Sequence, residues 1–258
     1  MATQISFFEE FPDSATFEKA ALIDFDTKIY LAAKSLPEFE TYETWLKVAN
    51  PHVTDVVYWP VLEKDEGYWI SSWAEPSALE RVLGEVEQRK DRKPLDVMLD
   101  LEPSLKRSRL FSFKDFRRNK DYVSDFVRNA GSNNISIYTV EKSYIPEFIL
   151  EPLGLSYNPA EYGNKQMKMF YSSFRRAVLP DFIVNKLFER KARQYKKRNT
   201  IMGLGCIIGG VHETEPVNSP GILKYEVETA KAIGLEEVVI FRLNGLSDEY
   251  LKAISKSL

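Results

Sequence analysis

The sequence predicts a single (β/α)8 barrel of TIM type, and three observations lead to this expectation. The chain has 258 residues, close to the roughly 250 residues typical of that fold. Eight short apolar segments with strand character alternate with segments of helical character along the chain. These apolar segments are nearly continuous, as parallel strands covered on both faces should be. No linker or low-complexity stretch interrupts the alternation, so we expect one domain over residues 1–258.

The eight predicted strands are runs of β-branched, aromatic and aliphatic residues that end at proline, glycine or charged residues. They are expected at residues 5–11, 28–33, 55–60, 95–101, 135–140, 167–172, 200–208 and 237–242. Helices are expected at 14–22, 38–48, 76–89, up to about 129, 145–154, 180–197, 222–233 and 248–257. Ser14 is expected to cap the first helix. The alternative is a doubly wound open sheet, but no glycine-rich phosphate loop follows the first strand.

Composition excludes several classes of protein. Apolar residues make up 44% of the chain and charged residues 28%, and the net charge of −3 gives no global attraction to nucleic acid. The single cysteine, Cys206, rules out an internal disulfide and a cysteine-based zinc cluster, and it fits a reducing compartment. No secretory signal is recognised, and no apolar run approaches the roughly 20 residues that span a bilayer. We therefore expect a cytoplasmic protein without nucleic-acid or membrane partners; the oligomeric state is not predicted.

The fourth predicted strand ends in two acids and a proline, in the stretch Leu95–Pro103. Side chains alternate along a strand, so Asp100 and Glu102 point the same way, roughly 7 Å apart. Placing two acids at the end of a buried strand costs free energy, and such a cost is most often associated with chemistry. The alternative is that both acids only end the strand and form caps or salt bridges with nearby turns.

Active sites of such barrels lie at the carboxyl ends of the strands. This rule brings together acids, aromatic residues and one arginine from distant parts of the sequence, and alternation turns only one of Glu9 and Glu10 inward. Arg242, which ends a buried strand, needs an acidic partner. The loop 63–73 is long and aromatic and is predicted to form a wall or lid. The residues predicted to line the pocket are Glu10, Tyr58, Trp59, Trp69, Trp73, Asp100, Glu102, Glu141, Tyr171, Arg242 and Asn244.

Two of these strand ends resemble the motifs of chitinase-like glycoside hydrolases of family 18. Leu99-Asp100-Leu101-Glu102-Pro103 is similar to the end of that family's strand-four motif, D-x-x-D-x-D-x-E, although Asp96 is out of register with its earlier aspartates. Met169-Phe170-Tyr171-Ser172 resembles the strand-six motif M-x-Y-D, with serine in place of the aspartate. The family's strand-eight tryptophan and strand-three serine-and-glycine motif are absent. The resemblance implies that Glu102 is the general acid, that Asp100 orients the N-acetyl group of the substrate, and that Tyr171 supports that group.

Three functional hypotheses follow. The first is an enzyme that cleaves or processes a carbohydrate, without a cofactor, with Glu102 as general acid/base and Trp59, Trp69 and Trp73 stacking on sugar rings. A nearby carboxylate favours the protonated form that a proton donor requires, whereas a direct pair with Arg242 would keep Glu102 ionised. The second is a metal-dependent enzyme that holds Mg²⁺ or Mn²⁺ through Glu10, Asp100, Glu102 and His212. The third is a barrel that binds a sugar or an anionic metabolite without turnover.

The chain also contains two basic runs, at residues 106–118 and 190–198. The second alternates with an apolar helical stripe and is interpreted as a solvated helix face. The first follows the strand with the two acids and is predicted to bind an anionic ligand at the barrel mouth.

Overall fold

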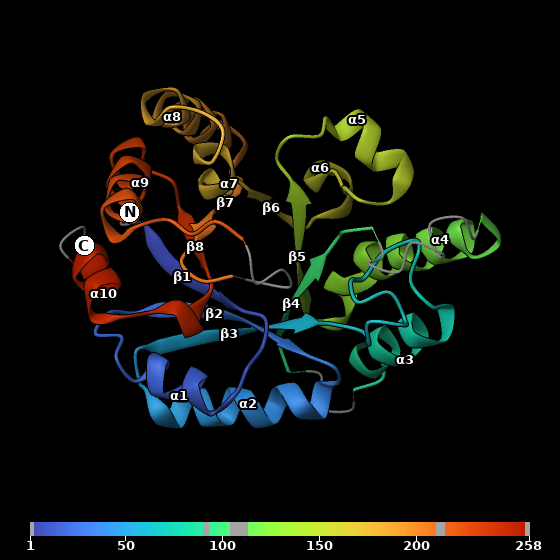
Figure 1. The fold of residues 1–258 in the computed structure, drawn as a ribbon. Coiled ribbons are helices and arrows are strands. Elements are labelled where there is room, and N and C mark those ends of the chain that lie inside the picture. The colour runs from blue at the N-terminus through green and yellow to red at the C-terminus, as the bar shows by residue number, and fades with distance from the viewer. Residues whose placement is uncertain (1–2, 90–92, 104–112, 210–214, 256–258) are drawn as a thin grey trace. The chain divides into compact units, whose positions relative to one another are not determined.

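The computed structural model describes residues 3–89, 93–103, 113–209 and 215–255 (Figure 1). Eight parallel strands in this part of the chain close into a barrel in the order β1-β2-β3-β4-β5-β6-β7-β8. Helices follow the strands in alternation, so the predicted fold class is confirmed. Closure pairs the first strand with the last: Phe8 of β1 lies opposite Phe241 of β8.

The strands are short and mostly buried, as expected for a barrel wall covered by helices. They span β1 Gln4–Glu9, β2 Thr27–Ala33, β3 Val53–Pro60, β4 Leu95–Asp100, β5 Ile135–Lys142, β6 Lys165–Met169, β7 Ile201–Cys206 and β8 Glu237–Phe241. The helices are α1 Ser14–Ala20, α2 Leu36–Ala49, α3 Pro76–Glu87, α4 Phe113–Asn129, α5 Glu147–Leu150, α6 Pro159–Tyr162, α7 Ser172–Arg176, α8 Asp181–Arg198, α9 Pro220–Ile233 and α10 Asp248–Ser255. Short 3₁₀ turns occur at Ala130–Asn133, Glu151–Leu153 and Leu243–Gly245.

Some local predictions differ from the structure. The cap of α1 is Asp13 rather than Ser14, because the Asp13 side chain accepts from the Thr16 backbone and Thr16 Oγ accepts from the Asp13 backbone. This reciprocal arrangement satisfies two helix-end donors at once. Strand β6 ends at Met169, and Tyr171 is the N-cap of the short helix α7. Helix α7 was not predicted because its five residues are too few to show helical periodicity.

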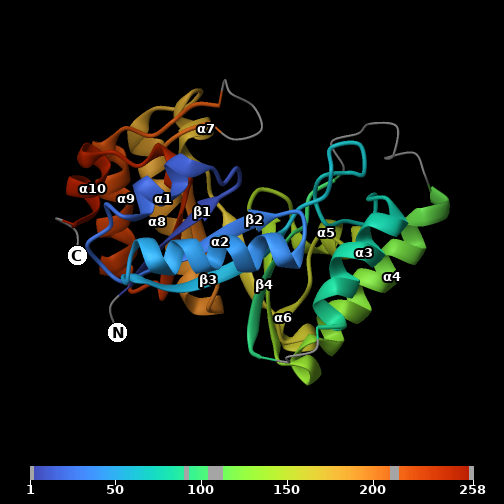
Figure 2. The ribbon, with the colours of Figure 1, turned by 90° about the horizontal axis from the view of Figure 1, so that it is seen from below.

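The chain divides into two compact units, and several elements contribute to both. Unit 1 comprises Met1–Leu31, Glu43–Val56 and Lys168–Leu258; unit 2 comprises Ala32–Tyr42 and Val57–Met167. In unit 1, helices α8, α9 and α10 form a neighbouring series outside β7 and β8 (Figure 1). In unit 2, helices α3 and α4 run side by side (Figure 2).

The core of unit 1 contains a polar cluster near the starts of its strands. Lys28 of β2 forms a buried ion pair with Glu237 of β8, with 3.0 Å between Nζ and Oε2. Glu237 Oε1 also accepts from Ser6 Oγ at 2.7 Å and from Tyr30 OH at 2.9 Å. Because every charged atom has a partner, the cluster satisfies buried groups that would otherwise be costly. These residues face away from the carboxyl ends of the strands, so the cluster has a structural role.

The core of unit 2 also contains a buried carboxylate. Glu141 of β5 accepts from Ser156 Oγ at 2.7 Å, from the Tyr157 backbone at 3.2 Å and from Gln166 Nε2 at 3.0 Å.

Among residues 3–89, 93–103, 113–209 and 215–255, none of the helices is long and apolar enough to cross a membrane.

Candidate functional site

The two acids predicted at the end of β4 differ in their surroundings. Asp100 is the last residue of the strand and is only 8% exposed. Glu102 lies two residues further, and its side chain is 25% exposed. Its Oε2 atom forms an ion pair with Lys142 Nζ of β5 at 3.0 Å. Thus Glu102 is accessible to a ligand and carries a cation as its neighbour.

Strand register explains why Lys142 meets Glu102. Asp100 lies opposite Val140 in the β4–β5 ladder, so continuing both strands by two residues brings Glu102 and Lys142 to the same level. Burial alone would lower the pKa of Lys142, but the charge of Glu102 and hydrogen bonds to Glu102 and Tyr144 outweigh it and raise the pKa. Lys142 is therefore held as an ammonium beside Glu102. The predictions omitted this lysine because they ended strand five at Val140.

Glu141 was predicted to line the pocket, but it is buried and its carboxylate is hydrogen-bonded within the protein, as expected of a structural residue. It is 1% exposed, and its oxygens accept hydrogen bonds from the segment after β5 and from β6. These contacts tie the chain around Ser156 to the end of the strand. Glu141 therefore offers little surface to a ligand.

Tyr58 and Trp59, at the end of β3, are both buried. The ring of Tyr58 packs against Phe39 of α2, with 4.9 Å between centroids. Burial raises the pKa of its phenol far above the ordinary value, with further increases from the charges of Glu85 and Glu38. Tyr58 thus lies in the layer between strand and helix, which corrects its predicted place in the pocket. Strand alternation turns Trp59 to the opposite face.

The aromatic loop after β3 is fixed by specific contacts. Asn119 of α4 donates to the carbonyls of Ser72 and Ala74, at 3.3 and 2.8 Å, and the ring of Trp73 packs against Phe116 of α4 at 5.1 Å. Trp69 is half-buried and contacts the Tyr68 ring edge-on at 5.4 Å. These contacts give the loop the character of a fixed wall against α4. Its position over a pocket remains a prediction.

At the strand ends of unit 1, Arg242 has the acidic partner that the sequence required. That partner is Glu9, which is fully buried and lies 2.9 Å from the guanidinium. The Glu9 carboxylate also accepts from the backbone nitrogens of Phe11 and Asn244, at 2.9 and 2.8 Å. Burial raises the pKa of Glu9, although Arg242 and these two backbone donors act to lower it. Arg242 and Asn244 therefore join the loops after β1 and β8 through Glu9.

Glu10, which follows Glu9 in the chain, lies near Cys206 at the end of β7. Burial, and to a smaller extent the negative charges of Glu215 and Glu10, raise the pKa of the Cys206 thiol to about 12. Cys206 is buried and packs as a small apolar residue without the character of a nucleophile. Glu10 is itself buried.

Tyr171 and Ser172, which follow β6, lie in different surroundings. The Tyr171 ring contacts Phe241 of β8 and Phe174 of α7, with centroid distances of 5.9 and 6.0 Å. Ser172 Oγ accepts from Asn218 Nδ2 at 2.8 Å and belongs to a buried network that contains Glu226. The Ser172 hydroxyl is thus part of a buried hydrogen-bond network.

No group of three or more histidine, cysteine, aspartate or glutamate residues within the described ranges is arranged to hold a metal ion. His212, a ligand in the metal hypothesis, lies outside the described residues, as do residues 106–112 of the first basic run.

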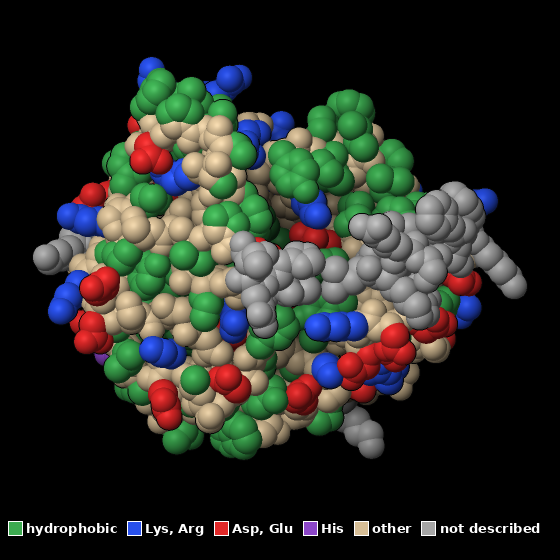
Figure 3. Space-filling view, in the orientation of Figure 1, with side chains coloured by type: hydrophobic (Ala, Val, Ile, Leu, Met, Phe, Trp, Pro, Cys, Tyr) green, Lys and Arg blue, Asp and Glu red, His purple; other side chains and the backbone are tan. Residues whose placement is uncertain are grey.

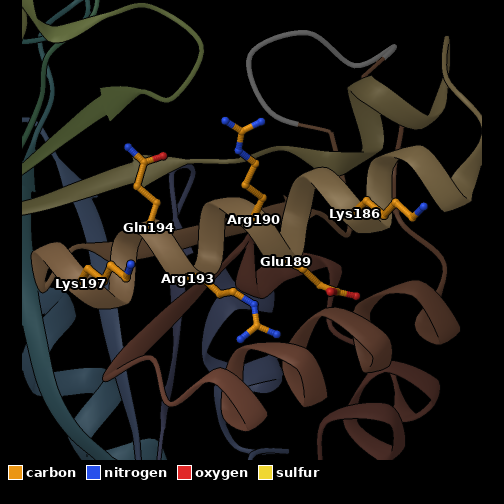
Figure 4. A pocket seen from close by; sticks show the side chains of 6 residues that line it. All are labelled: Lys186, Glu189, Arg190, Arg193, Gln194 and Lys197. Carbon is orange, nitrogen blue, oxygen red and sulfur yellow. The ribbon is translucent and has the colours of Figure 1, made fainter.

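A hollow of about 590 Å³ lies on helix α8 (Figure 4). It is lined by Lys186, Glu189, Arg190, Arg193, Gln194 and Lys197. All six residues lie on this one helix and most are exposed, so the second basic run is a solvated helix face, as the sequence indicated. None of the predicted site residues lines this hollow.

Comparison with known proteins shows the fold. No family profile matches the sequence, and no curated protein sequence matches it. The chain is similar in structure to active domain 2 of a chitinase from Pyrococcus furiosus, with TM-score 0.57 and 10% identity over 100% of this chain and 95% of that chain. It is similar to the catalytic domain of beta-amylase from Paenibacillus polymyxa, with TM-score 0.51 and 9% identity over 100% and 99%.

A third similar structure is a GH5-4 endoglucanase from Bacteroides salanitronis, with TM-score 0.50 and 13% identity over 96% of this chain and 86% of that chain. All three are glycoside hydrolases with TIM barrels. At these identities the likeness concerns the fold alone, and family 18 in particular remains a prediction.

Proposed function

We propose that this barrel is a glycoside hydrolase-like enzyme in which Glu102 acts as general acid/base on a glycosidic bond. The observation that carries the proposal is the partly exposed Glu102 carboxylate at the carboxyl end of β4, 3.0 Å from Lys142. Asp100, two residues earlier and nearly buried, supplies the second carboxylate that such chemistry uses. The fold is one that several glycoside hydrolases share.

Lys142 is the charged neighbour of Glu102, with 3.0 Å between Nζ and Oε2. To act as a base, Glu102 takes a proton from a water molecule or a hydroxyl group. To act as an acid, it must carry a proton taken up from solvent, and a substrate that displaces the ammonium would favour that form.

Replacing Glu102 with glutamine tests the proposal. The wild type is first assayed on a panel of aryl glycosides and of β-1,4- and α-1,4-linked oligosaccharides. On the compound that it cleaves, the turnover of the variant should be lower by on the order of 100-fold or more. The amide keeps the shape of the side chain but loses the ion pair with Lys142, and because both side chains are partly exposed the thermal midpoint should fall only slightly. Glu40→Gln, on the exposed part of α2, is the matched control and should keep full activity. A fully active Glu102→Gln variant would contradict the proposal, and sugar binding without turnover in the wild type would favour the non-catalytic barrel.

Lys142→Met should move one limb of the pH–activity profile to higher pH. Without the ammonium the Glu102 carboxylate accepts a proton more readily, so the limb that reports its titration moves upward. If the acid limb moves, Glu102 works as a base; if the alkaline limb moves, it works as an acid. Lys34→Met, which breaks the exposed pair with Glu63 (2.7 Å), is the control and should leave the profile in place. Identical profiles for Lys142→Met and the wild type would remove Glu102 from the rate-limiting proton transfer.

A further inference from the structure

Helix α8, in unit 1, concentrates positive charge on one element of the chain. Its 18 residues include seven cations and two acids, so the helix has a net charge of +5 in a chain whose net charge is −3. The overall charge, from which no membrane partner was expected, averages over this asymmetry. Between residues 186 and 198 the exposed side chains are six cations and one amide: Lys186, Arg190, Arg193, Gln194, Lys196, Lys197 and Arg198.

Helix stability accounts for only part of this charge. The basic last turn stabilises the negative end of the helix macrodipole. Lys186, Arg190 and Arg193 lie before that turn, so the dipole does not explain them. Within the described part of the chain, no carboxylate forms an ion pair with these three cations. Glu189, the acid that lines the same hollow, instead accepts a hydrogen bond from Tyr225 OH at 3.0 Å.

The cations around α8 are close enough to affect one another. Burial lowers the pKa of Lys191, and nearby positive charges lower it further. These charges belong to Arg175, Lys168, Arg190 and Arg198. Like charges that are held together in this way repel one another, and an anionic partner relieves the repulsion.

Large apolar side chains are exposed at the start of the same helix. Val178 and Phe182 are 78% and 64% exposed, and Phe182 lies one turn before Lys186 on the same side of α8. Figure 3 shows hydrophobic side chains gathered over α7 and α8. A lipid interface provides partners for both cations and apolar side chains, whereas a nucleic-acid backbone is bound through its phosphates and offers no apolar partner.

We propose that the exposed face of α8 is a docking surface for a membrane that contains anionic phospholipids. The row from Lys186 to Arg198 is about 18 Å long at about 1.5 Å per residue, so its cations meet several headgroups of a flat surface. The hollow of about 590 Å³ on α8 receives one headgroup phosphate. Phe182 and Val178 enter the boundary between headgroups and acyl chains. This contact is peripheral and requires no helix that crosses the bilayer.

Vesicle binding by the full chain tests the proposal. Vesicles of phosphatidylcholine, alone or with about 30% phosphatidylserine, are titrated at about 150 mM salt, where screening limits weak attraction between charges. The wild type should bind only the anionic vesicles. Arg190→Gln/Arg193→Gln should raise the apparent Kd about 10- to 30-fold, as expected for two cations near an anionic surface. Phe182→Ala should raise it about threefold to tenfold, because less apolar area is inserted.

Two paired variants serve as controls. Arg190→Lys/Arg193→Lys keeps both charges and should keep binding, which separates the loss of charge from a loss of fold. Lys47→Gln/Lys252→Gln removes the same charge from exposed positions on α2 and α10 and should bind like the wild type. Equal weakening by the pair Lys47→Gln/Lys252→Gln, equal binding to both kinds of vesicle, or no binding to anionic vesicles would overturn the proposal.

A single-stranded RNA of random sequence is titrated in parallel. If RNA binding depends on Arg190 and Arg193 while vesicle binding does not, the face binds nucleic acid and the membrane proposal is wrong. None of these measurements involves turnover. The result is therefore independent of whether Glu102 is the acid/base of the function proposed above.

Discussion

Replacing Arg242 with alanine should lower the free energy of unfolding by about 3–5 kcal/mol at neutral pH, the usual cost of breaking a buried ion pair. The variant leaves the Glu9 carboxylate fully buried and without the cation 2.9 Å away. It also removes the bond from Arg242 Nε to the Gly209 carbonyl, at 3.2 Å, and the stacking of the guanidinium on Phe11 at 5.0 Å. Chemical denaturation of wild type and variant measures the difference.

The loss should be smaller in acid, and the sign follows from Glu9. Burial already raises the pKa of Glu9, and removing Arg242 takes away a charge that opposes this shift. A carboxyl whose pKa is raised on folding stabilises the protein at low pH, and this stability is lost as the pH rises through the folded-state pKa. Arg242→Ala should therefore lose more at pH 8 than at pH 5.

The matched control is Lys47→Ala, which breaks the exposed pair with Glu43 at 2.7 Å on α2. Surface pairs of this kind contribute about 0.3–0.5 kcal/mol. A loss in Arg242→Ala no larger than that in Lys47→Ala would mean that Glu9 does not depend on its buried partner.

The sequence allowed the barrel to be predicted because its evidence is repeated along the chain. Each strand is an apolar run that ends at a proline, a glycine or a charged residue. An error in the bounds of one strand therefore does not change the bounds of the others. Strand four is typical: Leu95–Asp100 was expected to within one residue, since its apolar residues and Pro103 define both ends. Helix α7 was missed because a five-residue helix carries too little periodicity to be distinguished from a loop.

Site residues were harder to predict, because partners depend on register and direction as well as residue type. Arg242 was correctly expected to need an acid, yet nothing in the sequence distinguished Glu9 from Glu102 as that acid. The partner of Glu102, Lys142, follows only once Asp100 is known to lie opposite Val140. Tyr58 shows the same limit, because a change of one residue in strand parity moves a side chain from the barrel interior to the helix layer.

Ser172 illustrates a contact that residue type alone does not predict. Its hydroxyl accepts from the Asn218 amide, which also donates to Glu226 Oε2 at 3.2 Å. Gly205 of β7 makes room for this amide, since a Cβ atom there would clash with Asn218 Nδ2. The network therefore depends on residues of three separate elements, and no single stretch of sequence indicates it.

Glu226, at the centre of this network, should make the protein less stable as the pH rises from about 5 to 8. Its side chain is fully buried on α9, and burial raises its pKa from 4.5 to about 7. Ser172, Arg176 and the Gly205 backbone act in the opposite direction without cancelling this effect. The folded protein thus holds the proton more tightly than the unfolded chain, so the stability that Glu226 contributes is complete below about pH 4.5 and is lost as the pH rises through about 7.

Glu226→Gln should therefore be more stable than wild type at pH 8 and similar to it at pH 5. A shift of this size corresponds to about 3 kcal/mol of difference between the two pH values. Arg176, 3.5 Å from Glu226, keeps its bonds to Asp181 at 2.8 Å and to Asn185 at 2.7 Å, so the variant does not strand a buried cation. Denaturation of wild type and Glu226→Gln is measured at both pH values. Glu9 is present in both proteins, so the difference between them reports Glu226. Glu228→Gln, an exposed position on the same helix, is the control. Parallel pH dependence in wild type and Glu226→Gln would show that this carboxyl titrates at an ordinary pKa, with its ionised form fully compensated by Arg176, Ser172 and Asn218.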